Sequence, residues 1–143
     1  CTIPAGKQLF FPLVNNWCTI APELGDPDEL LALWGADVEA WFDANYANTC
    51  ALTLRVDGKD VVPDFDELYT THYLKVMEPF EVDVNPAWAP EYTAGGPMPT
   101  LGAGHYARLM PLTPGDHVVE FGGSICGDHP FTTAVTYHLH VEP

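Results

Sequence analysis

Fourteen prolines and twelve glycines fall between short apolar runs along these 143 residues. Such regular punctuation is typical of all-β domains, because Pro and Gly interrupt regular structure and favour tight turns. Within the runs, apolar and polar side chains alternate, as in "TYHLHV" (136–141), which places the apolar ones on one face of a strand. The sequence therefore predicts an all-β fold: a β-sandwich, Ig-like or jelly-roll, of about eight strands in a single domain, residues 1–143.

One segment breaks this pattern and predicts a short helical insertion at about 26–48, after a first strand at 7–14. Asp26 is placed to cap the helix, with Pro27 at its first position and Glu29 completing a capping box. Gly35 is expected to end or kink the helix, so that a second helical piece follows. Large apolar residues at helical spacing are expected to lie in the core: Trp34, Trp41 and Phe42.

Two hairpins are predicted from turn residues between alternating runs. In "ALTLRVDGKDVV" (51–62), Asp57-Gly58 supplies a two-residue turn. In "HYARLMPLTPGDHVVEFGG" (105–123), the "TPGD" turn is expected to join two paired strands. Between them, the Pro- and Gly-rich stretch at 85–104 is predicted to be a long loop, and Pro12 is expected at a strand edge or bulge.

The charge balance excludes some partners. Five Lys and Arg stand against 20 Asp and Glu, which gives a net charge of −15. Nucleic acids and anionic membranes need a basic face, so neither is expected as a partner. No apolar run approaches the roughly 18 residues of a membrane span. Divalent cations, basic partners and neutral sugars remain compatible with this charge.

Four cysteines are present, Cys1, Cys18, Cys50 and Cys126, and no two have the CxxC spacing of zinc ribbons or redox motifs. An even number in an acidic, turn-rich β chain favours disulfides and an oxidising compartment, either secreted or on the cell surface. Three connectivities are open, and buried free thiols are the alternative. The sequence begins at Cys1, and we interpret this as a processed or truncated start.

The stretches "CTIPAGKQLFFPLVNNWC", "LRVDGKDV", "HYARLMPLTPGDHVVEFGG" and "VTYHLHV" together resemble a family of secreted bacterial proteins of unknown function. The resemblance covers nearly the whole chain in order and implies no catalytic residue. It implies a disulfide between Cys18 and Cys50, while Cys126 either pairs with Cys1 or stays free. Family members carry a further segment upstream of the position of Cys1, and they tend to have threonine where this chain has His140.

Histidines suggest one candidate metal site. His138 and His140 are two residues apart and share a strand face, and His117 is a candidate neighbour. Copper or zinc sites use such imidazole pairs, but they need a third or fourth ligand. The competing interpretation is a solvent-exposed polar face, because the alternation puts Val135, Tyr137, Leu139 and Val141 on the opposite side.

Carboxylates suggest a calcium site. Asp64, Asp66 and Glu67 lie close together in "PDFDEL" (63–68), with Asp60 nearby. Extracellular β domains hold Ca²⁺ with such oxygen ligands, although each of these residues also suits a cap or a turn.

Trp88 and Tyr92 lie in the 85–104 stretch and are candidates for stacking on sugars or apolar partners. The competing interpretation is that these loop rings fold back over the edge of the core. Catalysis has no comparable signal, because Ser124 lacks the G-x-S-x-G context of a nucleophile elbow. The sequence therefore predicts a non-catalytic extracellular structural, adhesive or assembly module, either a homo-oligomer or one whose sheet a partner chain completes by strand addition. The alternatives are a carbohydrate- or metal-binding module and a metal-dependent secreted enzyme.

Overall fold

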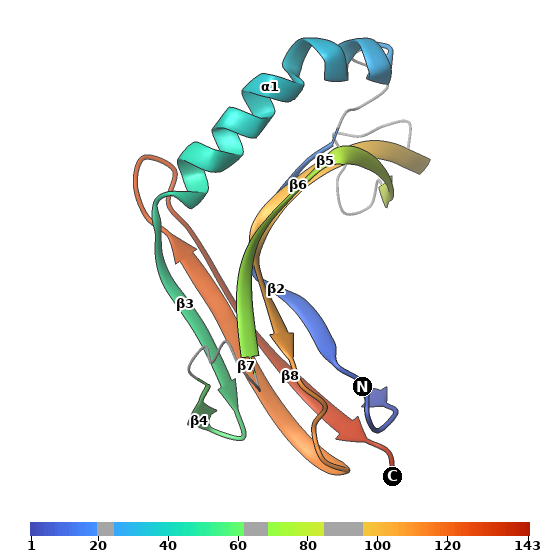
Figure 1. The fold of residues 1–143 in the computed structure, drawn as a ribbon, viewed down its shortest axis with the longest axis vertical. Helices are drawn as coiled ribbons and strands as arrows, with labels where there is room; N and C mark the ends of the chain where they lie inside the picture. Colours follow the sequence, from blue (N-terminus) through green and yellow to red (C-terminus); the bar gives the residue numbers. More distant parts are fainter. Residues whose placement is uncertain (20–24, 62–68, 85–95) are drawn as a thin grey trace. The chain divides into compact units, whose positions relative to one another are not determined.

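A computed structural model describes residues 1–19, 25–61, 69–84 and 96–143 (Figure 1). Most of these residues lie in strands of two sheets, and one helix follows the first long strand, as the all-β prediction expected. In chain order the elements are β1 (Thr2–Ile3), β2 (Leu9–Thr19), α1 (Pro27–Tyr46), β3 (Thr49–Val56), β4 (Lys59–Asp60), β5 (Tyr69–Val84), β6 (Gly96–Leu109), β7 (Gly115–Ile125) and β8 (Phe131–Val141).

The larger sheet has five strands in the order β1-β8-β7-β3-β4. Its centre is a long antiparallel ladder between β7 and β8 that runs without a register shift from Gly115↔Val141 to Ile125↔Phe131. β3 pairs with the other side of β7, and β1 pairs in parallel with the end of β8 over two residues. The hairpin predicted at 51–62 is confirmed for β3 and β4, because Asp57 and Gly58 both adopt positive φ in the connecting turn.

The smaller sheet has the order β2-β6-β5. The predicted hairpin at 105–123 is therefore wrong: the "TPGD" turn joins β6 and β7, which belong to different sheets. The predicted loop at 85–104 is also wrong for its second half, since β6 begins at Gly96. Glycine in this strand permits close pairing, because a Cβ at Gly104 would lie 2.6 Å from the carbonyl oxygen of Val14 in β2.

The chain forms two compact units. The first comprises Cys1–Asn15, Asn45–Leu74 and Gly104–Pro143, and the second Asn16–Ala44 and Lys75–Ala103. The core of the first unit draws on strands of both sheets, as expected for a β-sandwich. Its buried members are Phe11, Leu13, Leu54, Ala107, Leu109, Val119, Phe121 and Leu139. The prediction of a single domain over residues 1–143 stays a prediction.

Helix α1 begins as the sequence predicts. Asp26 Oδ1 accepts hydrogen bonds from the backbone N–H groups of Asp28, at 3.0 Å, and Glu29, at 3.3 Å. This cap satisfies donors that the first helical turn leaves without partners. The predicted break at Gly35 is wrong, because α1 is one continuous helix. A lone glycine lowers helix stability but does not have to end a helix.

The expectation for the three large apolar residues of α1 is confirmed for one of them. Phe42 is fully buried, whereas Trp34 and Trp41 are 44% and 43% exposed. Helical spacing places residues on a face, but it does not supply an element to cover that face. No helix among the described residues is long and apolar enough to cross a membrane.

Candidate functional site

Strand β8 carries an apolar row that is covered at one end only. Because the β7–β8 ladder has no register shift, alternate residues from Phe131 to Val141 share one face. Leu139 and Val141 in this row are 4% and 2% exposed, and Leu139 belongs to the core. Phe131, Val135 and Tyr137 face the same way but are 39%, 36% and 44% exposed. The inner face of the sheet is therefore incompletely covered along the first part of β8.

Among the strands that the structure describes, none pairs with the backbone edge of β8 beside this same stretch. β1 pairs only with His140 and Val141, so among the described strands β8 has one neighbour, β7, along most of its length. The N–H of His140 donates to the carbonyl of Cys1, and the carbonyl of His138 accepts from the Cys1 nitrogen at 2.8 Å. Alternate residues of an antiparallel strand present their backbone groups to the same edge. The N–H groups of Thr132, Ala134, Thr136 and His138 therefore point to the open edge.

One side-chain contact reaches across from this stretch. The hydroxyl of Thr133, on the apolar face of β8, donates a 2.6 Å hydrogen bond to the carbonyl oxygen of Leu13 in β2. The contact holds β2 near β8 at one point without adding a strand to the ladder. The β8 surface formed by Phe131, Val135 and Tyr137 and the adjoining open edge is called the β8 edge site below.

The two candidate metal histidines lie on the opposite face of β8. His138 and His140 are exposed and line an open depression of about 380 Å³, together with Cys1, Thr2 and residues of β7. Asp116 stands opposite His140 in the β7–β8 ladder, and its Oδ1 accepts a 2.6 Å hydrogen bond from His140 Nδ1. The predicted shared face is thus confirmed, and the structure adds a carboxylate that the sequence did not identify.

His117 is paired elsewhere. It also lines the depression, but its Nδ1 lies 2.8 Å from Asp57 Oδ2 and its Nε2 lies 2.8 Å from the carbonyl of Thr113. The hydrogen bond to Asp57 is the main reason that the pKa of His117 is raised above its ordinary value. A hydrogen bond from the Val118 N–H, followed by the one from His117, lowers the pKa of Asp57. With both ring nitrogens engaged, His117 has a structural role in the β3–β4 turn.

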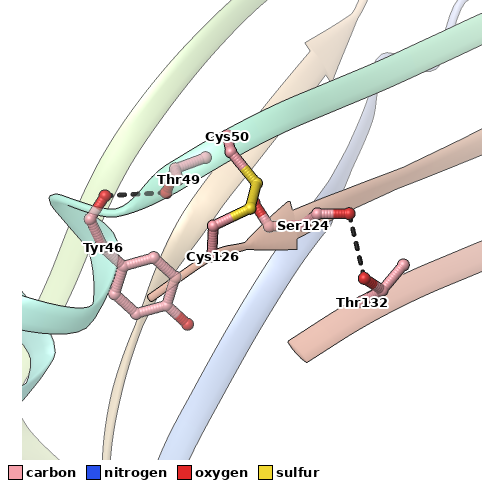
Figure 2. The surroundings of a disulfide bond; sticks show 6 residues. All are labelled: Tyr46, Thr49, Cys50, Ser124, Cys126 and Thr132. Carbon is pink, nitrogen blue, oxygen red and sulfur yellow. Dashed lines mark hydrogen bonds between the residues drawn. A yellow bond between two sulfur atoms is a disulfide. The ribbon is translucent and has the colours of Figure 1, made fainter. Parts of the chain in front are cut away.

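The disulfide differs from the one that the family resemblance implied. Cys50 is bonded to Cys126 (Figure 2). Cys18 and Cys1 are free thiols. Cys50 lies between Thr49 and Ala51, where the register of β3 against β7 shifts. Thr49 is paired there with Ile125, the residue directly before Cys126. The Cys126 N–H also bonds to the carbonyl of Asn48 at 2.9 Å. The pairing of Cys18 with Cys50 is therefore wrong.

The alternative pairing of Cys1 with Cys126 is also wrong, for a reason of distance. Cys1 lies beside His140 near one end of β8, and Cys126 precedes Phe131 at the other end. Nine residues of extended strand span roughly 30 Å. Near the disulfide, Ser124 Oγ lies 3.0 Å from Thr132 Oγ1 across the ladder, so it makes a structural contact there (Figure 2).

Three of the four predicted calcium ligands, Asp64, Asp66 and Glu67, lie outside the part of the chain that the structure describes. Asp60 is described, and its carboxylate forms a 3.0 Å ion pair with Arg55 Nε in the β3–β4 hairpin. No group of three or more His, Cys, Asp or Glu side chains in the described ranges is arranged to hold a metal ion.

The predicted stacking residues, Trp88 and Tyr92, also lie outside the described residues. Within the second unit, however, two other tryptophans line an open hollow of about 440 Å³ between β2 and α1: Trp17 and Trp41, with Asp37 and Thr19. Trp17 is largely exposed. A smaller and more apolar hollow adjoins Cys18, and burial raises the pKa of its thiol. Sequence reasoning assigned Trp41 to the core and did not consider Trp17.

No protein-family model matches this chain, and searches of curated proteins and of solved structures give no significant match. The resemblance to secreted bacterial proteins therefore stays a prediction.

Proposed function

We propose that this protein is a non-catalytic extracellular assembly module, whose β8 edge site takes up a strand from a second copy of the chain. The carrying observation is the apolar row of β8, which is buried at Leu139 and Val141 and exposed at Phe131, Val135 and Tyr137. An added strand beside β8 would place its own side chains next to the exposed part of this row, where they make cross-strand contacts. It would also bond the open backbone groups of the strand.

The composition of the β8 edge site supports this proposal. Residues 131–137, "FTTAVTY", contain no charged side chain, although the chain as a whole carries a net charge of −15. Natural proteins usually protect a free strand edge with charges, prolines or bulges, because an unprotected edge pairs with other chains. The β7–β8 ladder has no bulge along its length. The edge therefore has the features of a pairing surface.

The extracellular part of the proposal is supported by the disulfide between Cys50 and Cys126. Disulfides persist in oxidising compartments and are rare in the reducing cytosol. A disulfide also stabilises the chain before it assembles. At that stage the exposed apolar surface is not yet buried and adds little stability.

The test is sedimentation velocity over a range of protein concentrations, with one substitution inside the β8 edge site and one outside it. The wild type is expected to form dimers or larger species as concentration rises. Val135→Lys places a charge in the apolar row and is expected to leave the protein monomeric. Leu33→Lys adds the same charge at an exposed apolar position of α1, outside the β8 edge site, so its association is expected to persist. A wild type that is monomeric at every concentration, or equal behaviour of both variants, contradicts the proposal.

A second candidate function is carbohydrate binding, favoured by the hollow between β2 and α1. Trp17 and Trp41 supply faces that stack on sugar rings, and Asp37 supplies hydrogen-bond acceptors for hydroxyl groups. A glycan array is the direct measurement. Trp41→Ala is expected to abolish a signal that Trp34→Ala, a change of an equally exposed tryptophan outside this hollow, leaves intact. Absence of any signal with the wild type rules this candidate out.

A further inference from the structure

We propose that His138 and His140 bind one divalent transition-metal ion through their imidazoles, with Asp116 as a positioning residue. This inference is independent of the proposed assembly function, because the two histidines lie on the face of β8 opposite the apolar row. Residues two apart on a strand have Cα atoms about 7 Å apart, and their side chains project in the same direction. Two imidazoles at this spacing can converge on one ion.

The contact between Asp116 and His140 is the observation that separates this pair from two ordinary surface histidines. Asp116 Oδ1 lies 2.6 Å from His140 Nδ1, and the two residues are direct cross-strand partners. When Nδ1–H donates to the carboxylate, the lone pair of His140 Nε2 is free for a metal ion. Histidine ligands of metal sites commonly have such a carboxylate partner, which fixes the tautomer and raises the basicity of the ring.

The surroundings favour an accessible site with water as the remaining ligands. Both histidines line the open depression of about 380 Å³. Because no group of three protein ligands is found in the described part of the chain, the coordination shell is completed by solvent. Imidazole nitrogens suit Cu²⁺, Zn²⁺ and Ni²⁺, whereas Ca²⁺ and Mg²⁺ prefer oxygen ligands. The net charge of −15 also raises the local concentration of cations.

Isothermal titration with Zn²⁺ tests the assignment of the ligands. The wild type is expected to bind one equivalent, and His138→Ala and His140→Ala are each expected to weaken binding by about tenfold or more. His129→Ala removes an exposed histidine outside the depression and is expected to bind Zn²⁺ as the wild type does. Because both ligands are exposed, the melting temperatures of these variants should not change. His138→Gln, which keeps a polar side chain, serves as a second variant if His138→Ala does not fold.

Electron paramagnetic resonance with Cu²⁺ identifies the coordinating atoms. Spectra are recorded in the Cys1→Ser variant, because a free thiol in the depression reduces Cu²⁺. Hyperfine couplings from two imidazole nitrogens are expected. Asp116→Asn is expected to keep this two-nitrogen spectrum while lowering Zn²⁺ affinity by about tenfold, which a purely structural role for Asp116 would not do.

Three results would each overturn the proposal. The first is the absence of stoichiometric Zn²⁺ binding to the wild type. The second is unchanged binding in both His138→Ala and His140→Ala. The third is loss of Zn²⁺ binding in Cys1→Ser, which would make the thiol, not the imidazole pair, the main ligand. Sedimentation of His138→Ala should match that of the wild type, so failure of this proposal and failure of the assembly function can be told apart.

Discussion

The two halves of β8 have the same alternating pattern and different surroundings. In the last three residues, Leu139 and Val141 are buried, and β1 pairs with the strand edge. Earlier in the strand, Val135 and Tyr137 occupy equivalent positions on the same face and remain exposed, and no described strand lies beside them on the outer edge. Alternation thus determines which face a side chain is on, whereas burial depends on neighbours that the strand itself does not encode.

The two halves are also held in different ways. The end near Val141 is held by core packing around Leu139. Near the end at Phe131, Ser124 of β7 and Thr132 make a polar contact across the ladder, and the disulfide between Cys50 and Cys126 joins β3 to the residue that follows β7. Substitutions in one half at a time therefore separate these contributions.

The largest effect is expected from the disulfide at the exposed end. Replacing Cys50 and Cys126 by serine opens a link between residues 76 apart in sequence. On the chain-entropy estimate this lowers the free energy of unfolding by about 4 kcal/mol. Urea denaturation measures the change. Cys18→Ser, which removes a free thiol, is the control and should leave the denaturation midpoint nearly unchanged; an equal loss in both proteins would contradict the observed pairing.

The next largest effect is expected from a comparison of two positions in the apolar row of β8. Leu139→Ala in the covered half removes buried methyl groups and is expected to cost about 2–5 kcal/mol. Val135→Ala in the exposed half is expected to cost less than about 1 kcal/mol, because little buried surface is lost. Both values come from denaturation of the monomer at low protein concentration. Similar costs at the two positions would mean that the row is covered along its whole length.

The smallest effect concerns the ion pair of His117 and Asp57 near the covered end. The raised pKa of His117 gives stability that is complete below its ordinary value of 6.5 and is lost as pH rises through the folded-state pKa. The lowered pKa of Asp57 gives stability that is present above 3.8 and is lost as pH falls through its folded-state pKa. The pair therefore stabilises most between these two values.

Asp57→Asn tests this pH window, since asparagine tolerates the positive φ of the turn. Between pH 4 and 6.5, the variant is expected to melt at a lower temperature than the wild type. The corresponding loss in the free energy of unfolding is no more than about 1 kcal/mol. The difference should shrink as pH rises above this window. A difference that stays constant from pH 5 to 9 would show that the pair does not contribute through its charges.

Local features of the fold could be predicted because they depend on neighbouring residues. The Asp57-Gly58 hairpin requires positive φ at two adjacent positions, and the Asp26 cap needs one carboxylate before a helix. The break predicted at Gly35 was wrong, because the rest of the helix outweighs the cost of one glycine.

Features that depend on which strands become neighbours could not be predicted. Cys50 and Cys126 meet because β3 pairs with β7, and the sequence does not specify that pairing. Asp116 reaches His140 only through the register of β7 and β8. The shared face of His138 and His140, by contrast, follows from alternation and was predicted. The exposure of Val135 and Tyr137 depends on which segments of the folded chain lie beside them, which alternation does not reveal.

Amide hydrogen exchange followed by NMR tests the assembly function most directly, because it reports on the backbone of β8 one residue at a time. In dilute protein, the outward-pointing N–H groups of Thr132, Ala134, Thr136 and His138 should exchange quickly, whereas that of His140, bonded to Cys1, should be protected. At concentrations where the chains associate, the account predicts that those four amides become protected together. Association that leaves them exchanging quickly, or that protects another strand instead, would contradict it.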